Sequence, residues 1–493
     1  MYETLLEFSR QVGRVGSWLW TWVFGIALVG GGIWFSVRTG FVQFRFLGDA
    51  LKFLAGKHTG KTKGEGDGVS KPKDSFSAFQ SFCISECSRV GTGNIVGTIV
   101  AILMGGPGAI FWMWAMALFG AATNFVECSL GQLHKVNAKD RFLGGPMYYF
   151  QKAFKNTKVP SIVVAVVIAF TYGFIFNSIQ LNTVAVNLAP FTQALGFGAM
   201  YRLSIGLVVA AIVAFVIFGG ARRIVKFATI LMPAIIITFL SVCFFVILFN
   251  IPSFIQAMAL IVTSAFSYTA VAGGAVGFTI GTALQQGLMR GLFSNEAGLG
   301  TVPIAASASE VSHPVKQGFV QSFGVLLDTI IICSATAFMV LMTGLHTEGF
   351  SAVELARQSM TYWIGAAGVP FMTVMLFFLP FTSLVGNYFY GETCMRFATT
   401  KKGPIIAYRI GCVLLIVFAS VVPLQLVWNI SNIFTGILVT FNLVGILILF
   451  NQVTKCLDNY TEQRKAFKAG TGGDPTFYDD MIGVDTDYWK RSR

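Results

Sequence analysis

The chain has 493 residues, of which 55% are hydrophobic and only 12% are charged, and its formal net charge is +13. Soluble globular chains carry about 25% charged residues, so this composition excludes an ordinary water-soluble fold and favours lipid as the solvent. The positive charge alone would allow nucleic acid as a partner, but the basic residues are distributed as in a membrane protein.

Apolar runs predict the membrane spans. A helix that crosses a bilayer needs about 20 mostly apolar residues. Runs of this kind predict eleven spans, in chain order near 17–36, 76–104, 107–132, 160–189, 203–219, 223–249, 257–289, 316–343, 366–395, 405–422 and 426–451. No small-residue cleavage site follows the first run, so we expect a permanent helix and not a signal peptide. Residues 41–54 alternate aromatic and basic side chains and are predicted to lie along the interface, and residues 58–74 form a polar loop.

Lysine and arginine predict the orientation. With the amino terminus outside, the outer segments hold only Arg10, Arg14, Arg202 and Arg357, and Arg89 falls inside a helix. The other thirty of the 35 basic residues then lie on the cytoplasmic side, as the positive-inside rule requires. The net charge therefore indicates topology and attraction to anionic lipid, and nucleic acid is not an expected partner.

The ten helices after the first divide into two sets of five, which run in opposite directions because five is odd. The first helix of each set is interrupted by glycine, at Gly91-Thr92-Gly93-Asn94 and at Ala272-Gly273-Gly274-Ala275. The third helix of each set carries polar residues, which are Asn177, Ser178, Gln180 and Asn182 in one and Thr382, Ser383 and Asn387 in the other. A single glycine pair more often serves close helix packing, but its recurrence favours the inverted repeat in which paired broken helices form the substrate site.

The predicted fold is therefore all-α and integral to the membrane. Residues 1–74 form an accessory helix and cytoplasmic loop, residues 75–250 and 251–453 form the two repeats, and residues 454–493 form a cytoplasmic tail.

The interruption at 91–94 has the charge layout of an amino-acid site. Unwound backbone persists in a membrane only where it lines a cavity. The carbonyls near 89–90 suit a cation or an ammonium group, and the N–H groups of 92–94 suit a carboxylate. Carbonyls near 269–272 would complete the ammonium site, and Gln180 would donate its amide to the carboxylate. We expect a methyl group on Gly93 to point at that carboxylate and not into a packed core.

Four charged residues fall within predicted spans, where an unpaired charge costs at least about 2.5–3.5 kcal/mol. Glu86 and Arg89 are three residues apart and can face each other, so we expect Arg89 to pair with Glu86 or Asp328 and not to touch substrate. For Asp328, shaping an ion site and structural hydrogen bonding are both open. For Glu127 a structural role is favoured, and 294–296 is interpreted as a cytoplasmic gate or as a helix-ending turn.

The cysteines and histidines give no sign of a metal centre or of catalysis. The eight cysteines are scattered without a Cys-x-x-Cys pair, and the four histidines lie in loops without ligand spacing. An intramembrane enzyme would need a nucleophile with a base or a metal pair, and a channel would need rings of carbonyls or charges; the sequence contains neither pattern. We expect no enzyme activity and no cofactor.

Several segments resemble the alanine/glycine:cation symporter family, the sodium:alanine symporters of the amino acid-polyamine-organocation superfamily. They are Arg89–Ile95, Gly105–Trp114, Gly144–Tyr149, Gly291–Gly300, His313–Gly318 and Leu327–Thr329. The resemblance implies the leucine-transporter-like fold, with 5+5 inverted repeats and one accessory helix. It also implies alternating access, sodium-coupled uptake of alanine, glycine or a related small neutral amino acid, and a multi-pass protein of a bacterial or archaeal plasma membrane.

The resemblance also implies site residues. The expected substrate-binding residues are Thr92, Gly93, Asn94, Gln180, Thr269, Gly273 and Gly274. The expected sodium ligands are the carbonyls near Cys87 and Val90 and the hydroxyls of Thr382 and Ser383. The alternative for the two hydroxyls is a bond back to their own helix. Proton coupling, or a preference for glutamine or serine within the same fold, stays open, whereas a channel or an intramembrane enzyme is less favoured.

Overall fold

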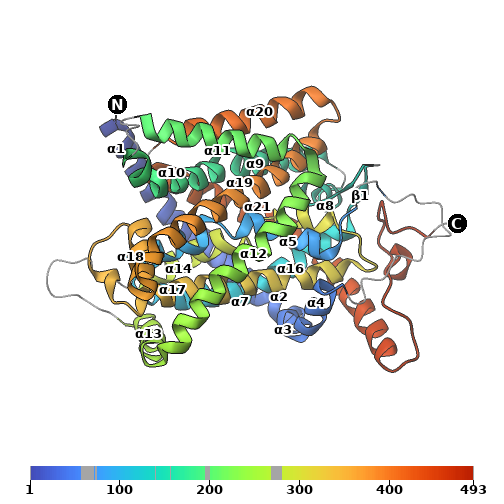
Figure 1. Ribbon diagram of the computed structural model, residues 1–493. Coiled ribbons are helices and arrows are strands. Elements are labelled where there is room, and N and C mark those ends of the chain that lie inside the picture. Colours follow the sequence, from blue (N-terminus) through green and yellow to red (C-terminus); the bar gives the residue numbers. More distant parts are fainter. Residues whose placement is uncertain are drawn as a thin grey trace.

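The computed structural model describes residues 2–56, 72, 75–138, 140–155, 157–194, 200–267, 280–422 and 424–491. Most long helices lie alongside one another across the width of Figure 1, and α12 (Gly220–Phe249) crosses them. The amino-terminal end and the carboxy-terminal end lie at opposite ends of the picture. The described part also contains one two-stranded antiparallel sheet, formed by β1 (Val136–Asn137) and β2 (Phe142–Leu143).

The first half of the chain contains one broken helix. Its elements are α1 (Tyr2–Leu19), η1 (Trp20–Phe24), α2 (Gly25–Arg38), α3 (Val42–Arg45), α4 (Leu47–Leu54), α5 (Ala78–Arg89), η2 (Gly93–Gly97), α6 (Thr98–Gly105), α7 (Ala109–Leu133), α8 (Pro146–Ala153), α9 (Lys158–Phe170), η3 (Thr171–Phe176), α10 (Asn177–Ala194), α11 (Tyr201–Ile217), α12 and α13 (Ile251–Ser264).

The second half supplies most of the helices that pack against the broken helix. Its elements are α14 (Ile280–Asn295), α15 (Val302–Ser307), α16 (Pro314–Leu326), η5 (Leu327–Cys333), α17 (Ser334–Leu341), η6 (Leu345–Thr347), α18 (Ala352–Ile364), η7 (Gly365–Ala367), α19 (Gly368–Ala398), α20 (Lys402–Ala419), α21 (Leu424–Lys468) and η8 (Asp479–Met481).

Among the described residues, eight helices are long and apolar enough to cross a membrane, and the number is nine if α5 and η2–α6 count as one bent span. The predicted span near 257–289 overlaps α13 and α14, and the predicted interruption at 272–275 lies outside the described residues. The count of eleven spans and the inverted repeat therefore stay predictions, while a mostly helical membrane architecture is confirmed.

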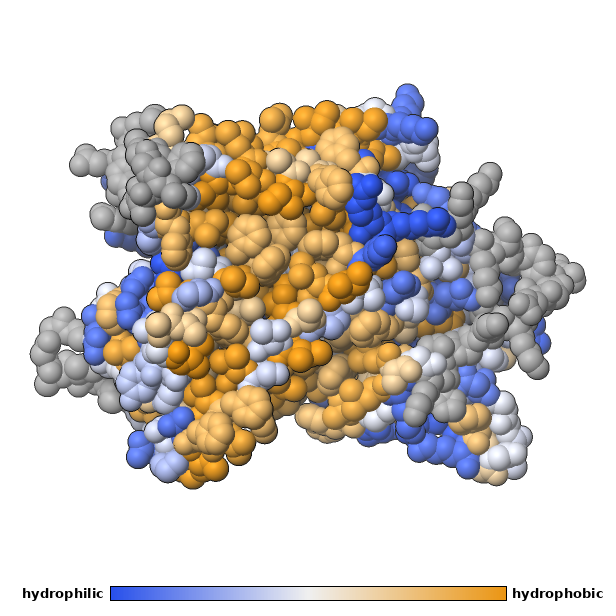
Figure 2. Space-filling view, in the orientation of Figure 1, coloured by the Kyte–Doolittle hydropathy of each residue, from blue (hydrophilic) through white to orange (hydrophobic). Residues whose placement is uncertain are grey.

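The surface agrees with this architecture. Hydrophobic side chains cover the middle of the face shown in Figure 2, and hydrophilic ones gather toward its left and right ends. Phe215 and Phe249 are 70% and 78% exposed, which is expected where lipid takes the place of water.

The last helix is longer than the predicted span, because α21 continues from 451 to Lys468. Val453, Cys456 and Leu457 are buried along this extension, so an apolar stripe carries the helix past the end of the hydrophobic run. The chain beyond it turns back, and the Trp489 Nε1 group donates to the Gln132 carbonyl at 2.9 Å.

Candidate functional site

The break between α5 and α6 is the centre of the candidate site. A capping box at Ser77 starts α5, which ends at Arg89, and the helix axis bends by 53° before η2 resumes at Gly93. Inside the break, the Gly91 N–H donates to Asn94 Oδ1 at 2.9 Å. The predicted interruption of this helix is confirmed, and its backbone is buried.

Two other helices meet the break at Gly91 and Thr92. The Thr92 N–H donates to Gln180 Oε1 on α10 at 2.9 Å. A Cβ on Gly91 would overlap the Ser383 hydroxyl of α19 and would lie 2.9 Å from Gln180 Oε1. The Thr92 hydroxyl is buried and has no hydrogen-bond partner in the part of the chain that the structure describes. Thr92, Gln180 and Ser383, which are predicted site residues on separate elements, therefore converge at the break.

The side chain of Asn94, just after the break, is engaged in hydrogen bonds. Asn94 donates its amide to Asp328 Oδ1, and Asp328 Oδ2 also accepts from the hydroxyls of Ser294 at 2.6 Å and Thr329 at 3.0 Å. The Asn94 side chain thus ties the broken helix to η5, and through Asp328 to α14.

The environment of Gly93 differs from the expectation. A Cβ there would lie 3.0 Å from the Phe293 ring and 3.3 Å from Ser294 Cα, so the expectation that an added methyl group avoids the packed core is wrong. The reason is tertiary, because Phe293 lies on α14 and packs against Phe176 and Trp428 with ring centroids 5.0 and 4.7 Å away. In the sequence, Phe293 falls within the segment Gly291–Gly300 that carries the family resemblance, but no pattern there indicates its contact with Gly93.

The predicted sodium ligands lie along the crossing of α5 and α19. A Cβ on Gly386 would lie 2.7 Å from the Ser88 nitrogen and 3.0 Å from the Cys87 carbonyl carbon, so the two backbones touch there. One turn earlier, the hydroxyls of Thr382 and Ser383 donate to the Leu379 carbonyl at 2.8 and 3.2 Å. This is the bond back to their own helix, and it leaves the oxygen lone pairs able to accept or to bind a cation.

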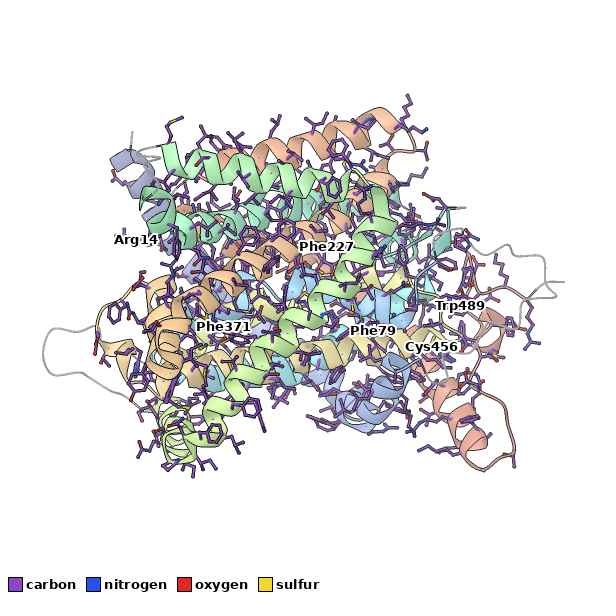
Figure 3. The ribbon with its side chains drawn as sticks, in the orientation of Figure 1. Arg14, Phe79, Phe227, Phe371, Cys456 and Trp489 are labelled. Carbon is purple, nitrogen blue, oxygen red and sulfur yellow. The ribbon has the colours of Figure 1, made fainter. Side chains whose placement is uncertain are left out.

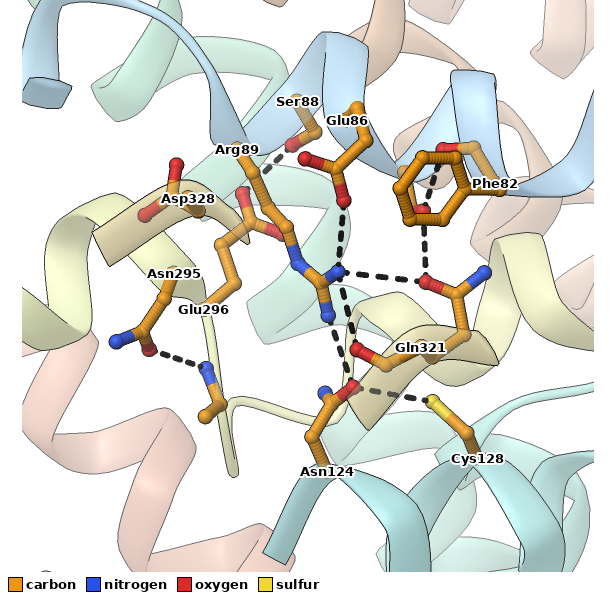
Figure 4. Close-up of polar contacts among 12 residues, drawn as sticks. Phe82, Glu86, Ser88, Arg89, Asn124, Cys128, Asn295, Glu296, Gln321 and Asp328 are labelled. Atoms are coloured by element: carbon orange, nitrogen blue, oxygen red, sulfur yellow. Dashed lines mark hydrogen bonds and ion pairs between the residues drawn. The ribbon is translucent and has the colours of Figure 1, made fainter. Parts of the chain in front are cut away.

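The guanidinium of Arg89 is held away from the break. Its Nη1 lies 3.0 Å from Glu86 Oε1, and its Nη2 donates to Asn124 Oδ1 at 2.9 Å (Figure 4). Contacts at 3.4 Å with the carbonyl and the Oε1 of Gln321 complete the surroundings. The predicted pairing of Arg89 with Glu86 is confirmed, and the cluster is fully buried.

Two buried glutamates shape the turn after α14. Glu127 accepts from the N–H groups of Gly298 at 3.0 Å and Gly300 at 2.9 Å, and from the amide of Asn442 at 2.6 Å, which is a structural role. Glu296 has a φ of +57° and lies 2.6 Å from the Ser88 hydroxyl of α5. The segment 294–296 is therefore a helix-ending turn that is also tied to the broken helix.

The sequence does not predict the polar contact that joins α10 to α19. Asn387 donates to Asn177 Oδ1 at 3.0 Å and lies 2.7 Å from the Ser88 hydroxyl. The sequence predicts polar residues in the third helix of each expected repeat, but no pattern in it pairs Asn387 with Asn177. Of the other predicted substrate residues, Thr269, Gly273 and Gly274 lie outside the described residues.

Comparison with solved structures shows that the fold is similar to that of a membrane transporter. A manganese transporter from Eremococcus coleocola, in complex with an aromatic bis-isothiourea substituted compound, matches with a TM-score of 0.52 at 12% identity, over 75% of this chain and 78% of that one. A mutant form of that transporter matches with a TM-score of 0.51 at 13% identity, over 78% and 83%. At this identity the likeness concerns the fold alone.

Comparison with curated proteins gives close relatives over nearly the full length. The chain is 42% identical to the probable sodium/glutamine symporter GlnT of Bacillus subtilis, over 96% of this chain and 93% of the relative. It is 38% identical to the amino-acid carrier protein AlsT of the same organism, over 95% of each. It is 35% identical to the sodium/alanine symporter AgcS of Methanococcus maripaludis, over 93% and 99%. The family model for sodium:alanine symporters matches residues 6–472, and the chain therefore belongs to the sodium:alanine symporter family.

Proposed function

We propose that this protein is a secondary active symporter that couples uptake of a small neutral amino acid, of the alanine and glycine class, to sodium influx. The observation that carries the proposal is the convergence of Gln180 and Ser383 on the break at Gly91 and Thr92. The proposed mechanism is alternating access, which the placement of the site supports, because a site between helices can open to one side when one helix group moves against another.

The substrate is held by the break itself. The carboxylate of the amino acid faces the N–H groups of Gly93 and Asn94 and the amide of Gln180, since backbone donors at a helix start favour an anion. Because Gln180 Oε1 already accepts from the Thr92 N–H, the Nε2 group is its donor toward substrate. The remaining wall consists of Thr269, Gly273 and Gly274, which belong to the second broken helix in the proposed repeat.

Sodium binds where α5 crosses α19. It is a hard cation that prefers oxygen ligands, and the proposed ligands are the carbonyls of Cys87 and Val90 with the hydroxyls of Thr382 and Ser383. Support comes from the backbone contact at Gly386 and from the approach of Ser383 to Gly91. The ion then lies beside the substrate, and binding of either favours binding of the other.

The proposed topology has eleven spans, with repeats at 75–250 and 251–453, a cytoplasmic tail from 454, and the amino terminus outside the plasma membrane. The positive-inside distribution of Lys and Arg supports it.

Uptake by the full chain in proteoliposomes tests the proposal. An inward sodium gradient should drive accumulation of labelled alanine above the outside concentration, and a sodium ionophore should abolish it. Equilibration without accumulation would favour a channel, and accumulation driven equally by a proton gradient in sodium-free buffer would favour proton coupling.

A second candidate substrate is glutamine, because the relative at 42% identity is named a probable sodium/glutamine symporter. Competition of alanine uptake by unlabelled glycine, serine and glutamine separates the two. Glutamine inhibiting at lower concentration than alanine itself would reassign the preferred substrate.

A further inference from the structure

A cavity of about 600 Å³ lies between α1, α6, α14 and α21. Its size is within the range of small-molecule sites, roughly 300–1,000 Å³. Arg14 of α1 stands at its edge, at the left end of the molecule in Figure 3. We call it the Arg290 cavity, after the buried residue that lines it.

Two aromatic rings stand between the Arg290 end of this cavity and Gly93 at the break. The Arg290 guanidinium lies 4.4 Å from the ring centroid of Trp428. Trp428 packs on Phe293, and Phe293 occupies the space next to Gly93. The cavity is therefore separate from the candidate substrate site and lies on the path of contacts that leads to it.

Arg290 is a buried cation without a counter-charge among the described residues. The residue is only 4% exposed, and its Nε and Nη1 groups have no hydrogen-bond partner within the described ranges. The sequence from Ala265 to Asn295 contains no acidic residue. A guanidinium stays protonated under all ordinary conditions, and a buried charge in a membrane protein is expected to have a partner. The Trp428 ring compensates only partly, so the group favours an anion.

Gln286 adds an acceptor next to this donor. It lies one helical turn before Arg290 and therefore on the same face of α14. Its Oε1 is also buried without a hydrogen-bond partner in the described part of the chain, and it lines the same cavity. An unsatisfied cation and an unsatisfied acceptor at this spacing match the two ends of a zwitterion.

We propose that the Arg290 cavity is a second binding site for an amino acid, which holds the carboxylate on Arg290 and the ammonium group on Gln286 Oε1. The proposal rests on the proposed function, since it assigns the same substrate class to a second site. A simple anion such as chloride would satisfy Arg290 but would leave Gln286 Oε1 unsatisfied. No predicted sodium ligand is among the described residues that line the cavity, so binding here does not require sodium.

The test counts alanine molecules bound by the purified full chain. Wild type should bind two per protein in saturating sodium and one in potassium buffer. Arg290→Met keeps an unbranched stem against Trp428 and should lose the molecule bound in potassium while keeping the sodium-dependent one. Gln286→Leu should weaken the same site at least tenfold. Arg38→Gln removes an exposed arginine that does not line the cavity and should change either site less than twofold.

Alanine analogues test whether the site binds both the carboxylate and the ammonium group. Alaninamide lacks the carboxylate and propionate lacks the ammonium group, so neither should displace alanine in potassium buffer at concentrations where alanine does. Displacement by propionate or chloride as effective as by alanine would overturn the zwitterion site in favour of a general anion site. A single alanine per wild-type protein, with sodium-driven uptake intact, would overturn the second site alone. Absence of sodium-driven uptake would instead overturn the proposed function.

Discussion

The backbone N–H of Thr92 donates to the side-chain oxygen of Gln180 across 2.9 Å. The bond ties the broken helix to α10 at the point where Ser383 of α19 also approaches. Backbone donors in a membrane must be satisfied by protein, so this contact stabilises the break and fixes its position relative to α10.

Gly91→Ala should abolish uptake. The added methyl group would overlap the Ser383 hydroxyl and would crowd Gln180 Oε1, so one of these groups must leave the break. Uptake of labelled alanine should fall at least a hundredfold while thermal stability falls modestly. Gly97→Ala is the matched control, because a Cβ there finds only ordinary contacts at 3.9 Å. Wild-type uptake by Gly91→Ala would show that these contacts do not shape the site.

The break could be predicted from the sequence because its cause is local. Gly91, Gly93 and Asn94 lie within four residues of one another and form the break by themselves. They include both partners of the bond from the Gly91 N–H to Asn94 Oδ1. The pairing of Glu86 with Arg89 was accessible for the same reason, because helical spacing alone brings the two side chains together.

The surroundings of Gly93 could not be predicted, because they depend on which face of α14 packs against the break. Phe293 lies 200 residues away in the sequence, and no spacing rule connects the two. Likewise, the return of the chain end to Gln132 through Trp489 depends on a tertiary surface that exists only after α7 and α16 have packed.

Ser383→Ala should raise the sodium concentration needed for half-maximal uptake, with a smaller effect on amino-acid affinity at saturating sodium. Thr382→Ala should act in the same direction but less, because it is Ser383 that approaches Gly91. Linkage requires that sodium and amino acid tighten each other by the same factor, so titrating each at several levels of the other checks both. If both variants keep the wild-type sodium dependence, the ion lies elsewhere and Asp328 is the next candidate ligand.

Arg89→Gln should destabilise the protein strongly, because it leaves the Glu86 carboxylate buried without its partner. Removing one member of a buried ion pair typically costs about 3–5 kcal/mol. The double variant Glu86→Gln/Arg89→Gln should recover part of this loss. Thermal midpoints of the purified variants measure the effect.

The exposed pair Lys490–Asp485, 3.2 Å apart, gives the control for Arg89. Its Lys490→Gln change should shift the midpoint little, since exposed pairs contribute about 0–1 kcal/mol. A double variant at Glu86 and Arg89 that is no more stable than Arg89→Gln alone would contradict the pairing argument.

Acid should weaken the attachment of the carboxy-terminal segment through His313. The imidazole is buried before α16, with Nε2 3.2 Å from Asn459 Oδ1 and the ring 5.1 Å from that of Phe477. Burial lowers its pKa from 6.5 to about 3. The unfolded chain therefore binds more protons than the folded chain between these values, so the free energy of unfolding rises with pH up to about 6.5 and falls as the pH drops toward 3.

The variant His313→Asn separates the titration of His313 from that of the other ionisable groups. Asparagine is a good residue before a helix start and does not titrate, so the thermal midpoint should fall less between pH 7 and pH 5 than in wild type. His134 has its pKa lowered to about 4 by burial and accounts for a residual slope in the same direction. His346→Asn, in the partly exposed helix η6, should leave most of the pH dependence in place. An unchanged slope in His313→Asn would show that His313 is not the group that titrates.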